Sequence, residues 1–384
     1  MAGAAASGAP TYTLANRRAG ARPTETGEMT LVFFVLGLVA LVVGASLLVR
    51  GAAKLSISFG ISPLVVGLTV VAFGTSAPET AVSVGAVLQG SSDIAVGNVV
   101  GSNIFNVLFI LGVSALIAPL VIHRQLVRQE VPIMIGASVV LGVMALDGHI
   151  GRFDATLLAG LLVAYVSFLI VQSRRAGSEA SGVPLAELPE ASRWDRHWSV
   201  QLLLIVAGLG LLVLGADWLV NSAVVFARAL DVSDLVIGLT VVAAGTSLPE
   251  VATSVVATLR GERDIAVGNV VGSNTFNIFG CLGVAGLVSP GGLEVAPPLL
   301  SFDLWVMLAA AIACFPIFVT GRELARWEGS LFLLYYAAYT VFLVLAATHH
   351  AALRGYADTM LAYVMPLTVI VLVVSLLRSN SARP

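Results

Sequence analysis

GLTVVAFGTSAPETAVSVGAVLQGSSDIAVGNVVGSNIFNVLFILG, at residues 67–112, returns as GLTVVAAGTSLPEVATSVVATLRGERDIAVGNVVGSNTFNIFGCLG at residues 238–283, with a constant offset of 171 and no gap. Each copy places an acid, Glu79 or Glu250, directly after a proline inside a largely apolar stretch. A carboxylate at membrane depth costs about 2.5–3.5 kcal/mol on insertion scales, and such groups usually serve a function. No Lys or Arg lies near either acid in the sequence, so the repeat predicts two carboxylates that bind a cation.

The composition is that of a polytopic membrane protein. Hydrophobic residues make up 58% of the chain, charged residues only 11%, and the mean hydropathy is +0.97, outside the range of soluble globular domains. We find eleven apolar runs of roughly 20 residues, the length that crosses about 30 Å of hydrocarbon. They lie at about 30–50, 61–89, 94–120, 130–147, 154–173, 199–223, 232–259, 265–289, 299–320, 329–348 and 358–378.

These runs predict an all-α protein. Continuous apolar runs exclude a β-barrel, because barrel strands alternate with period two. The second, third, seventh and eighth spans contain Gly, Pro, Asn or Ser near their middles, which is typical of broken helices.

Lys and Arg are distributed unevenly between the two sides that the spans define. One side carries fourteen: Arg50, Lys54, Arg124, Arg128, Arg174, Arg175, Arg193, Arg196, Arg260, Arg263, Arg322, Arg326, Arg378 and Arg383. The other carries six: Arg17, Arg18, Arg22, Arg152, Arg228 and Arg354. By the positive-inside rule, we expect a multi-pass protein of the cytoplasmic (inner) membrane with its N-terminus outside and its C-terminus inside.

The two copies of the repeat are expected to be inverted. Five spans separate the start of one copy from the start of the other, and five is odd, so Glu79 and Glu250 approach the midplane from opposite faces. Inverted repeats with broken helices that meet at a central site are the recurring architecture of secondary transporters. A pore needs no such symmetry.

The chain divides into two five-helix halves and three further segments. The first half is predicted at 29–173 with its repeat region at 61–120, and the second at 199–348 with its repeat region at 232–289. The other segments are a disordered N-terminal tail at 1–28, a cytoplasmic linker at 174–198 and an additional transmembrane helix at 357–379.

The first motif of each copy surrounds the acid with oxygen donors. It reads Gly74-Thr75-Ser76-Ala77-Pro78-Glu79 in one copy and Gly245-Thr246-Ser247-Leu248-Pro249-Glu250 in the other. Proline lacks an N–H, so we expect a break that frees the carbonyl four residues earlier. Hydroxyl, carbonyl and carboxylate oxygens suit Ca²⁺ or Na⁺, and the lack of thiolate or imidazole argues against Zn²⁺ or Cu⁺.

The second motif of each copy opens a further span and carries amide and hydroxyl groups. Ser102 and Asn106 are four residues apart and share a helix face, as do Ser273 and Asn277, so these side chains are expected to point at the acids. Intramembrane Ser and Asn often only bond across helices. The recurrence of both residues at the same spacing beside an acid favours the ion-binding interpretation.

Several other residues have structural explanations. The GxxxG patterns at Gly97/Gly101 and Gly268/Gly272 predict close helix packing, and Asp93 and Asp264 predict N-caps. Cys281 and Cys314 have no metal-ligand spacing and are expected to pack in the interior. Asp217 and Asp303 are weaker site candidates that fall near an interface, and the five histidines lie at span ends or in loops.

With its paired GTSxPE and GNVVGSNxFN motifs, the chain resembles the calcium/cation antiporter superfamily, specifically its prokaryotic sodium/calcium exchangers, over spans one to ten. The resemblance implies two inverted five-helix halves, four cation sites at the midplane, and exchange of sodium for calcium, commonly three for one. It implies side-chain ligands at Thr75, Ser76, Glu79, Ser102, Asn106, Thr246, Ser247, Glu250, Ser273 and Asn277, and main-chain carbonyl ligands at Ala72 and Ala243.

Differences from the motifs of related families narrow the range of ions that we expect the protein to transport. Potassium-dependent relatives and some archaeal exchangers carry aspartate where this chain has Asn277, so potassium transport is not expected. Proton/calcium exchangers usually have a glutamate in the GN motif, which neither copy has. The large cytoplasmic calcium-sensing domains of animal exchangers have no counterpart here.

The sequence thus predicts a secondary active transporter that exchanges Na⁺ for Ca²⁺ by alternating access. It is expected to be a membrane antiporter rather than an enzyme, with no cofactor. Its expected partners are Ca²⁺, Na⁺ and the lipid bilayer, with no nucleic acid and no obligate protein partner. Two alternatives stay open: a proton-coupled Ca²⁺/cation exchanger, which a desolvated glutamate can support, and a cation channel or non-transporting sensor.

Overall fold

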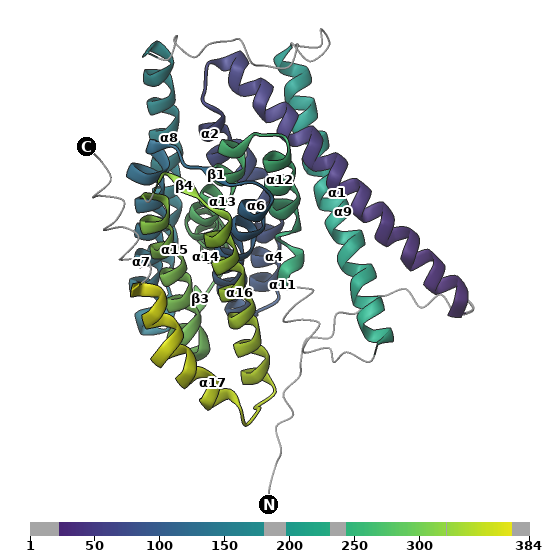
Figure 1. Cartoon of the computed structure of the whole chain (residues 1–384), viewed down its shortest axis with the longest axis vertical. Coiled ribbons are helices and arrows are strands. Elements are labelled where there is room, and N and C mark those ends of the chain that lie inside the picture. Colours follow the sequence, from purple (N-terminus) through teal and green to yellow (C-terminus); the bar gives the residue numbers. More distant parts are fainter. Residues whose placement is uncertain (1–22, 180–196, 231–242, 320, 371–384) are drawn as a thin grey trace, which may run out of the picture.

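The computed structural model describes residues 23–179, 197–230, 243–319 and 321–370 and is almost entirely helical (Figure 1). Nine helical segments within these ranges are long and apolar enough to span a bilayer. They are Met29–Phe59, Pro63–Leu88, Ser92–Ile117, Leu126–Asp147, Arg152–Ser173, Trp198–Ala229, Arg263–Val288, Leu299–Val319 and Arg326–Ala347. The predicted all-α polytopic fold is confirmed.

The predicted seventh and eleventh spans are only partly within the described residues. Of 232–259, the residues before Ala243 lie outside them, and of 358–378, those after residue 370 do. The predicted tail at 1–28 and linker at 174–198 also lie largely outside, although α1 begins at Pro23 and α8 ends at Glu179.

In the first half of the chain, most membrane spans are divided into several short helical segments. They are α1 (Pro23–Phe59), α2 (Pro63–Val66), η1 (Gly67–Val71), α3 (Ala72–Thr75), α4 (Ala77–Leu88), α5 (Ser92–Phe105), η2 (Asn106–Ile110), α6 (Leu111–Ile117), β1 (Leu120–Val121), η3 (Leu126–Glu130), α7 (Val131–Met144), η4 (Ala145–Asp147), β2 (His149–Ile150) and α8 (Arg152–Glu179).

The second half repeats this order. Its described elements are α9 (Trp198–Ala229), α11 (Ala243–Gly245), α12 (Leu248–Leu259), α13 (Arg263–Phe276), η8 (Asn277–Leu282), α14 (Gly283–Val288), β3 (Leu293–Glu294), η9 (Leu299–Asp303), α15 (Leu304–Val319), β4 (Glu323–Leu324) and α16 (Arg326–Ala347), followed by α17 (Leu353–Thr359) and η10 (Met360–Val364).

The helix that carries each acid breaks one residue before the segment that contains the proline. The breaks fall at Ser76 (φ −80°, ψ 4°) and Ser247 (φ −89°, ψ 8°), both in the bridge region between helix and strand conformations. Each proline then lies in the first turn of the following helix, where no intrahelical N–H partner is lost. The predicted breaks are confirmed, and proline starts the new helix rather than interrupting an old one.

Short π-helical turns, which the sequence did not predict, occur in the site helices of both halves. Asn106 is the first residue of η2, and Asn277 is the first residue of η8. Such turns widen the helix locally and are frequent at functional sites. Two further π-helical turns, η3 and η9, begin the fourth and ninth spans.

Two small antiparallel pairings show the inverted relation of the halves. β1 pairs with β4, and β2 pairs with β3. β1 follows α6 as β3 follows α14, so these two strands are equivalent. Figure 1 shows β1 and β4 near the upper end of the molecule and β3 near the lower end. Equivalent elements therefore lie at opposite ends, as the odd number of intervening spans predicts.

α1 and α9 lie side by side and slant away from the other helices (Figure 1). Glycines allow their backbones to meet: a Cβ on Gly44 would lie 2.8 Å from the Gly208 carbonyl oxygen, and a Cβ on Gly37 would lie 2.9 Å from that of Gly215. Spacings of seven residues on both helices keep these contacts on one face. Small residues are the usual means of close helix approach in membranes.

The predicted packing role of the second GxxxG pattern is confirmed. A Cβ on Gly268 would lie 2.9 Å from the Leu64 carbonyl oxygen, and one on Gly272 would lie 2.7 Å from the Leu68 carbonyl oxygen. For Gly97 and Gly101, the equivalent partner segment falls within 231–242, outside the described residues.

The N-cap prediction for the two aspartates is wrong. The N-cap positions of α5 and α13 are Ser91 and Glu262, and neither makes a side-chain capping bond. Asp93 and Asp264 are the second residues of these helices and lie in the first turn, where a carboxylate interacts favourably with the positive end of the helix dipole.

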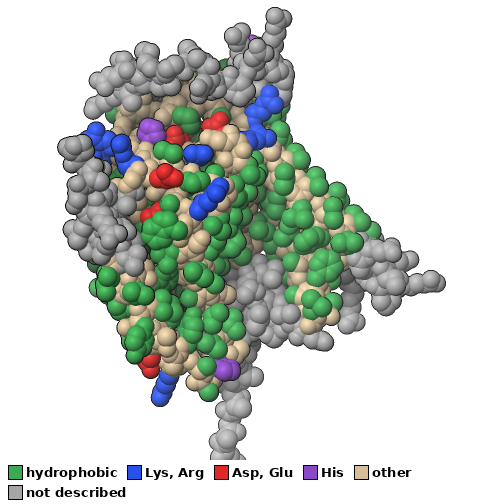
Figure 2. All heavy atoms as spheres, in the orientation of Figure 1, with side chains coloured by type: hydrophobic (Ala, Val, Ile, Leu, Met, Phe, Trp, Pro, Cys, Tyr) green, Lys and Arg blue, Asp and Glu red, His purple; other side chains and the backbone are tan. Residues whose placement is uncertain are grey.

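Charged side chains gather at one end of the molecule. Figure 2 shows most of the visible Lys and Arg at the upper end, where β1 and β4 lie, and a largely hydrophobic surface below. This uneven distribution agrees with the asymmetry counted in the sequence.

Gly208→Ala and Gly210→Ala form a matched pair that tests the α1–α9 contact. A Cβ on Gly208 would lie 2.7 Å from the Gly44 carbonyl oxygen, whereas a Cβ on Gly210 meets nothing within 4 Å. We expect Gly208→Ala to lower stability by about 1–3 kcal/mol through overpacking. Gly210→Ala should be neutral or stabilising by up to about 1 kcal/mol. Thermal unfolding in detergent measures both, and equal effects would contradict the proposed backbone contact.

Candidate cation site

The two repeat acids are buried together between the halves. Glu79 and Glu250 are each 0% exposed. The Ser247 hydroxyl donates to Glu79 Oε1 at 2.9 Å, and the Ser76 hydroxyl donates to Glu250 Oε1 at 3.5 Å. Each acid is thus bound by the serine that lies three residues before the other acid. These crossed bonds bring both predicted motifs into one site.

Several oxygens of this region have no hydrogen-bond partner within the described part of the chain. They are Glu79 Oε2, Glu250 Oε2, Ser102 Oγ, Ser273 Oγ, Asn106 Oδ1 and Thr246 Oγ1. Buried polar atoms are rarely left unpaired, because each costs about 1–3 kcal/mol. All six atoms belong to the predicted ligand set, and four of them form equivalent pairs in the two repeats. The donor chemistry therefore fits a hard cation held by oxygen.

Neither buried acid forms a salt bridge within the residues that the structure describes. Glu79 lies in the first turn of α4, and Glu250 lies in the first turn of α12. The N-terminal ends of these helices offer partial positive charge, which stabilises an anion but does not neutralise it. Two carboxylates in a low dielectric are therefore compensated either by protons or by bound cations.

The threonines and the two main-chain positions lie at the same breaks. The Thr75 hydroxyl donates to Asn269 Oδ1 at 3.1 Å and to the Ala72 carbonyl at 3.4 Å. The Ala72 carbonyl also accepts from the Ser76 N–H at 3.0 Å. In the second repeat, Ala243 begins α11, and Thr246 lies within the break between α11 and α12.

Two asparagines to which the sequence assigned no role lie at the contact between the repeats. Asn103 Nδ2 donates to the Asn274 carbonyl at 3.2 Å, and Asn274 Nδ2 donates to the Asn103 carbonyl at 3.3 Å. Their side-chain oxygens accept from the predicted ligands: Asn106 Nδ2 donates to Asn274 Oδ1 at 3.0 Å, and Asn277 Nδ2 donates to Asn103 Oδ1 at 3.1 Å. The four amides form a reciprocal network in which each half orients a ligand of the other.

A second missed pair supports the helices that carry the acids. Asn98 Nδ2 donates to the Glu79 carbonyl at 3.2 Å and to Ser83 Oγ at 3.1 Å. Asn269 does the same with the Glu250 carbonyl at 3.5 Å and Ser254 Oγ at 3.0 Å. The signal was present in the sequence, since both residues recur at the offset of 171, but spacing alone did not show which backbone they bind.

Cys281 is buried, as predicted, but it also contacts the site. Its Sγ lies 2.8 Å from Thr80 Oγ1 and 3.5 Å from Asn277 Oδ1. The first repeat has Ile110 at the equivalent position, so this contact has no counterpart there. Cys314 is also buried and belongs to the same hydrophobic core.

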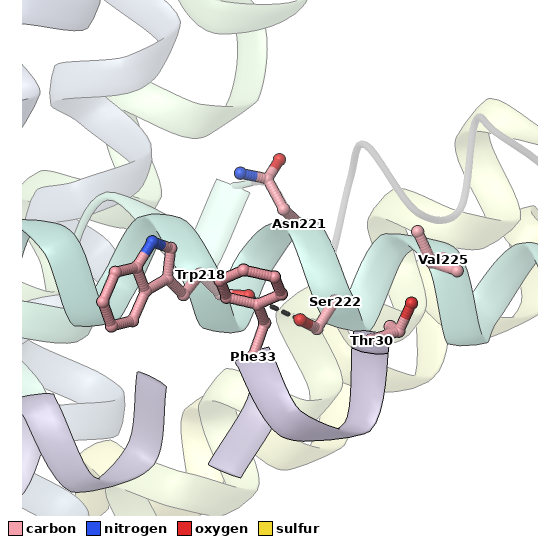
Figure 3. A pocket seen from close by; sticks show the side chains of 6 residues that line it. All are labelled: Thr30, Phe33, Trp218, Asn221, Ser222 and Val225. Atoms are coloured by element: carbon pink, nitrogen blue, oxygen red, sulfur yellow. Dashed lines mark hydrogen bonds between the residues drawn. The ribbon is translucent and has the colours of Figure 1, made fainter. Parts of the chain in front are cut away.

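A shallow hollow between α1 and α9 contains none of the predicted site residues. It is lined by Thr30, Phe33, Trp218, Asn221, Ser222 and Val225 (Figure 3). Asp217 beside it accepts a hydrogen bond from Asn221 at 3.0 Å and is exposed. The oxygen cluster of Glu79 and Glu250 is instead enclosed, which is typical of an occluded ion site rather than a surface pocket.

Two inverted halves that enclose a pair of uncompensated acids at broken helices define a membrane transporter of the secondary-carrier type. The chain belongs to the sodium/calcium exchanger protein family, whose profile matches residues 29–171 and 200–345. Both matched segments contain one copy of the repeat.

Individual relatives agree with this assignment. The inner membrane protein YrbG of Escherichia coli (strain K12) is 40% identical over 288 residues, which are 74% of this chain and 87% of that protein. The sodium/calcium exchanger MaX1 of Methanosarcina acetivorans is 35% identical over 346 residues, or 82% of this chain and 98% of that one. A solved structure of the sodium-calcium exchanger NCX_Mj, soaked without Na⁺ and Ca²⁺, matches with a TM-score of 0.70 at 30% identity, covering 82% of this chain and 99% of that one.

Asn103→Leu tests the reciprocal amide network. Leucine has a similar volume but leaves the Asn277 amide and the Asn274 carbonyl without their partners. We expect a loss of about 1–3 kcal/mol for each group left unpaired, and Asn274→Leu should cost a similar amount because its bonds are equivalent. Thermal unfolding of purified protein in detergent measures both. Wild-type stability of either variant would show that the network does not hold the halves together.

Proposed function

We propose that this protein exchanges Na⁺ for Ca²⁺ across the cytoplasmic membrane by alternating access. The observation that carries the proposal is the pair of fully buried carboxylates, Glu79 and Glu250, each with one oxygen bound by a serine of the other repeat and one oxygen unpartnered. Such a pair needs protons or cations to offset its charge in a low dielectric, and the surrounding hydroxyl, amide and carbonyl oxygens favour cations.

The proposed ligands are the predicted set. Glu79 and Glu250 bind both kinds of cation in turn, and neutral oxygens complete the coordination shells. These come from the hydroxyls of Thr75, Ser76, Ser102, Thr246, Ser247 and Ser273, the amides of Asn106 and Asn277, and the carbonyls of Ala72 and Ala243. The unpartnered Ser102, Ser273 and Asn106 oxygens support this part of the proposal.

Charge balance gives a reason for exchange rather than one-way flow. Two carboxylates balance one Ca²⁺ or two Na⁺, and a third Na⁺ would rest on neutral oxygens alone. Because Ca²⁺ and Na⁺ use the same ligands, they compete. An empty site leaves two uncompensated anions away from water and resists reorientation, so each crossing requires a bound cation.

The names of relatives and the charge distribution support the substrates and the orientation. MaX1 and NCX_Mj are named sodium/calcium exchangers, and the relative from Escherichia coli is an inner membrane protein. In the proposed orientation, the Lys- and Arg-rich end with β1 and β4 is cytoplasmic, with the N-terminus outside and the C-terminus inside. In this proposal, the two five-helix halves at 29–173 and 199–348 exchange their conformations during alternating access. Residues 357–379 form an additional transmembrane helix.

A gradient experiment separates sodium coupling from proton coupling. In proteoliposomes loaded with Na⁺, an outward sodium gradient should accelerate ⁴⁵Ca²⁺ uptake, because Na⁺ leaving the site exposes the carboxylates to Ca²⁺. A pH gradient without sodium should not. Uptake driven by the pH gradient alone would replace the proposal with a proton-coupled exchanger, and conductance far above carrier turnover would indicate a channel.

Glu79→Gln and Glu250→Gln should each abolish exchange. The substitution keeps the side-chain shape but removes half of the site's negative charge, so a bound Ca²⁺ is no longer balanced. Glu294→Gln is the control, since Glu294 is an exposed acid on β3. Sodium-driven ⁴⁵Ca²⁺ uptake is measured for all three variants. Near-normal uptake by either Glu79→Gln or Glu250→Gln would contradict the proposed role of that acid as a ligand.

A further inference from the structure

A second buried acid lies outside the cation site, in the fourth span. Glu130 is the last residue of the π-helical turn η3 and is 0% exposed. Its Oε2 accepts from the Tyr165 hydroxyl at 3.0 Å, and its Oε1 accepts from Gln125 Nε2 at 3.1 Å. Tyr165 belongs to α8, so the bond joins the fourth and fifth spans.

The second half contains the same arrangement. Asp303 is the last residue of the π-helical turn η9, is 8% exposed, and accepts from the Tyr339 hydroxyl at 2.8 Å. Tyr339 belongs to α16, so this bond joins the ninth and tenth spans. An acid that ends a π-helical turn and binds a tyrosine of the next span therefore occurs once in each half. The sequence did not reveal it, because one acid is a glutamate and the other an aspartate.

Unlike the repeat acids, these two groups are not suited to bind an ion. Both carboxylate oxygens of Glu130 already accept a hydrogen bond, and neither acid contributes an oxygen to the unpartnered buried atoms of the described residues. Glu79 and Glu250 each contribute one. The acid–tyrosine pairs are satisfied links between helices.

Aromatic contacts connect each tyrosine-bearing helix to a phenylalanine that directly precedes an asparagine of the cation site. The Tyr165 ring packs edge-on against Phe276 with centroids 6.3 Å apart, and Phe276 directly precedes Asn277. Phe276 also lies 5.9 Å from Phe73, which precedes Gly74 at the break in the second span. The Tyr165 ring thus contacts Phe276 of the second repeat, which in turn contacts Phe73 of the first.

In the second half, the contact with the first repeat is made by Tyr336, a neighbouring tyrosine of α16, and not by the acid-bound Tyr339 itself. Tyr336, one turn before Tyr339 on α16, packs edge-on against Phe105 with centroids 5.2 Å apart. Phe105 directly precedes Asn106. Phe105 and Phe276 are separated by the repeat offset, so each asparagine ligand follows a phenylalanine that is held by a tyrosine-bearing helix of the opposite half.

We propose that Glu130 and Asp303 are positioning residues that fix Asn277 and Asn106 through the tyrosine-bearing helices α8 and α16. The inference rests on the proposed function, in which these asparagines coordinate the transported cations. A directional hydrogen bond in the low-dielectric interior fixes the position of the tyrosine-bearing helix relative to the helix that carries the acid. The ring contact then restricts the position of the phenylalanine and of the asparagine that follows it.

Tyr165→Phe tests the link, because it removes the hydroxyl and keeps the ring against Phe276. We expect the Kd for Ca²⁺ to rise by about 3- to 10-fold, the equivalent of one ordinary hydrogen bond. In transport, the KM for Ca²⁺ should rise while kcat stays close to wild type. Tyr335→Phe is the matched control: its hydroxyl binds Thr368 at 2.6 Å on the partly exposed side of α16.

Glu130→Gln and the double variant Glu130→Gln/Tyr165→Phe test whether the loss of Ca²⁺ affinity comes from the hydrogen bond between these two side chains. Because both substitutions weaken one interaction, the double variant should bind Ca²⁺ no more weakly than the weaker of the two single variants. Tyr339→Phe in the second half is the independent variant if Tyr165→Phe does not yield folded protein. It should raise the same Kd.

Calcium titration of purified protein, followed by calorimetry, is the primary measurement because it does not require transport. Wild-type Ca²⁺ affinity in folded Tyr165→Phe or Tyr339→Phe, with or without lower thermal stability, overturns the inference. Wild-type protein that binds Ca²⁺ but does not exchange it contradicts the proposed function and leaves the affinity test valid. Wild-type protein that does not bind Ca²⁺ overturns both.

Discussion

The structure depends on two carboxylates that lie away from water without a cationic side chain to balance them. Glu79 and Glu250 are held by crossed hydrogen bonds from Ser247 and Ser76, so the charge of each half is oriented by the backbone break of the other. This constraint explains why both helices are broken. At each break, the serine lies between two helical segments and its hydroxyl binds the acid of the opposite repeat.

The inverted repeat turns this local arrangement into a symmetric site. Around Asn103 and Asn274, every bond of one copy has an equivalent in the other, and the ligand asparagines are oriented by amides across the interface. Where the copies differ, the symmetry is lost: Cys281 contacts Asn277, whereas the first repeat has an isoleucine at that position. Two nearly equivalent halves can exchange roles with little change in energy, which is the physical basis of alternating access.

Two hydrophobic cores surround the site. One joins the helices of both repeats with α7, α8 and α15, and the other joins α1 and α9 with parts of η1, α12 and α13. The α1–α9 contact is made by glycine backbones, and the acid–tyrosine links stabilise the larger core. The larger core thus contains most of the oriented polar groups, while the α1–α9 pair packs through apolar and backbone contacts.

The sequence by itself determined the membrane class, the inverted halves and the two acids, because apolar span length, span parity and an ungapped repeat are properties of the linear chain. It also predicted the breaks at the GTS motifs, since proline and glycine act locally. Tertiary structure alone decided that Ser247 binds Glu79 and that Asn103 binds Asn277. It also placed Asp93 and Asp264 inside their helices rather than at the caps, and it joined Glu130 to Tyr165. These contacts connect residues from different helices, and their partners are set by how the two halves pack, which no local pattern encodes.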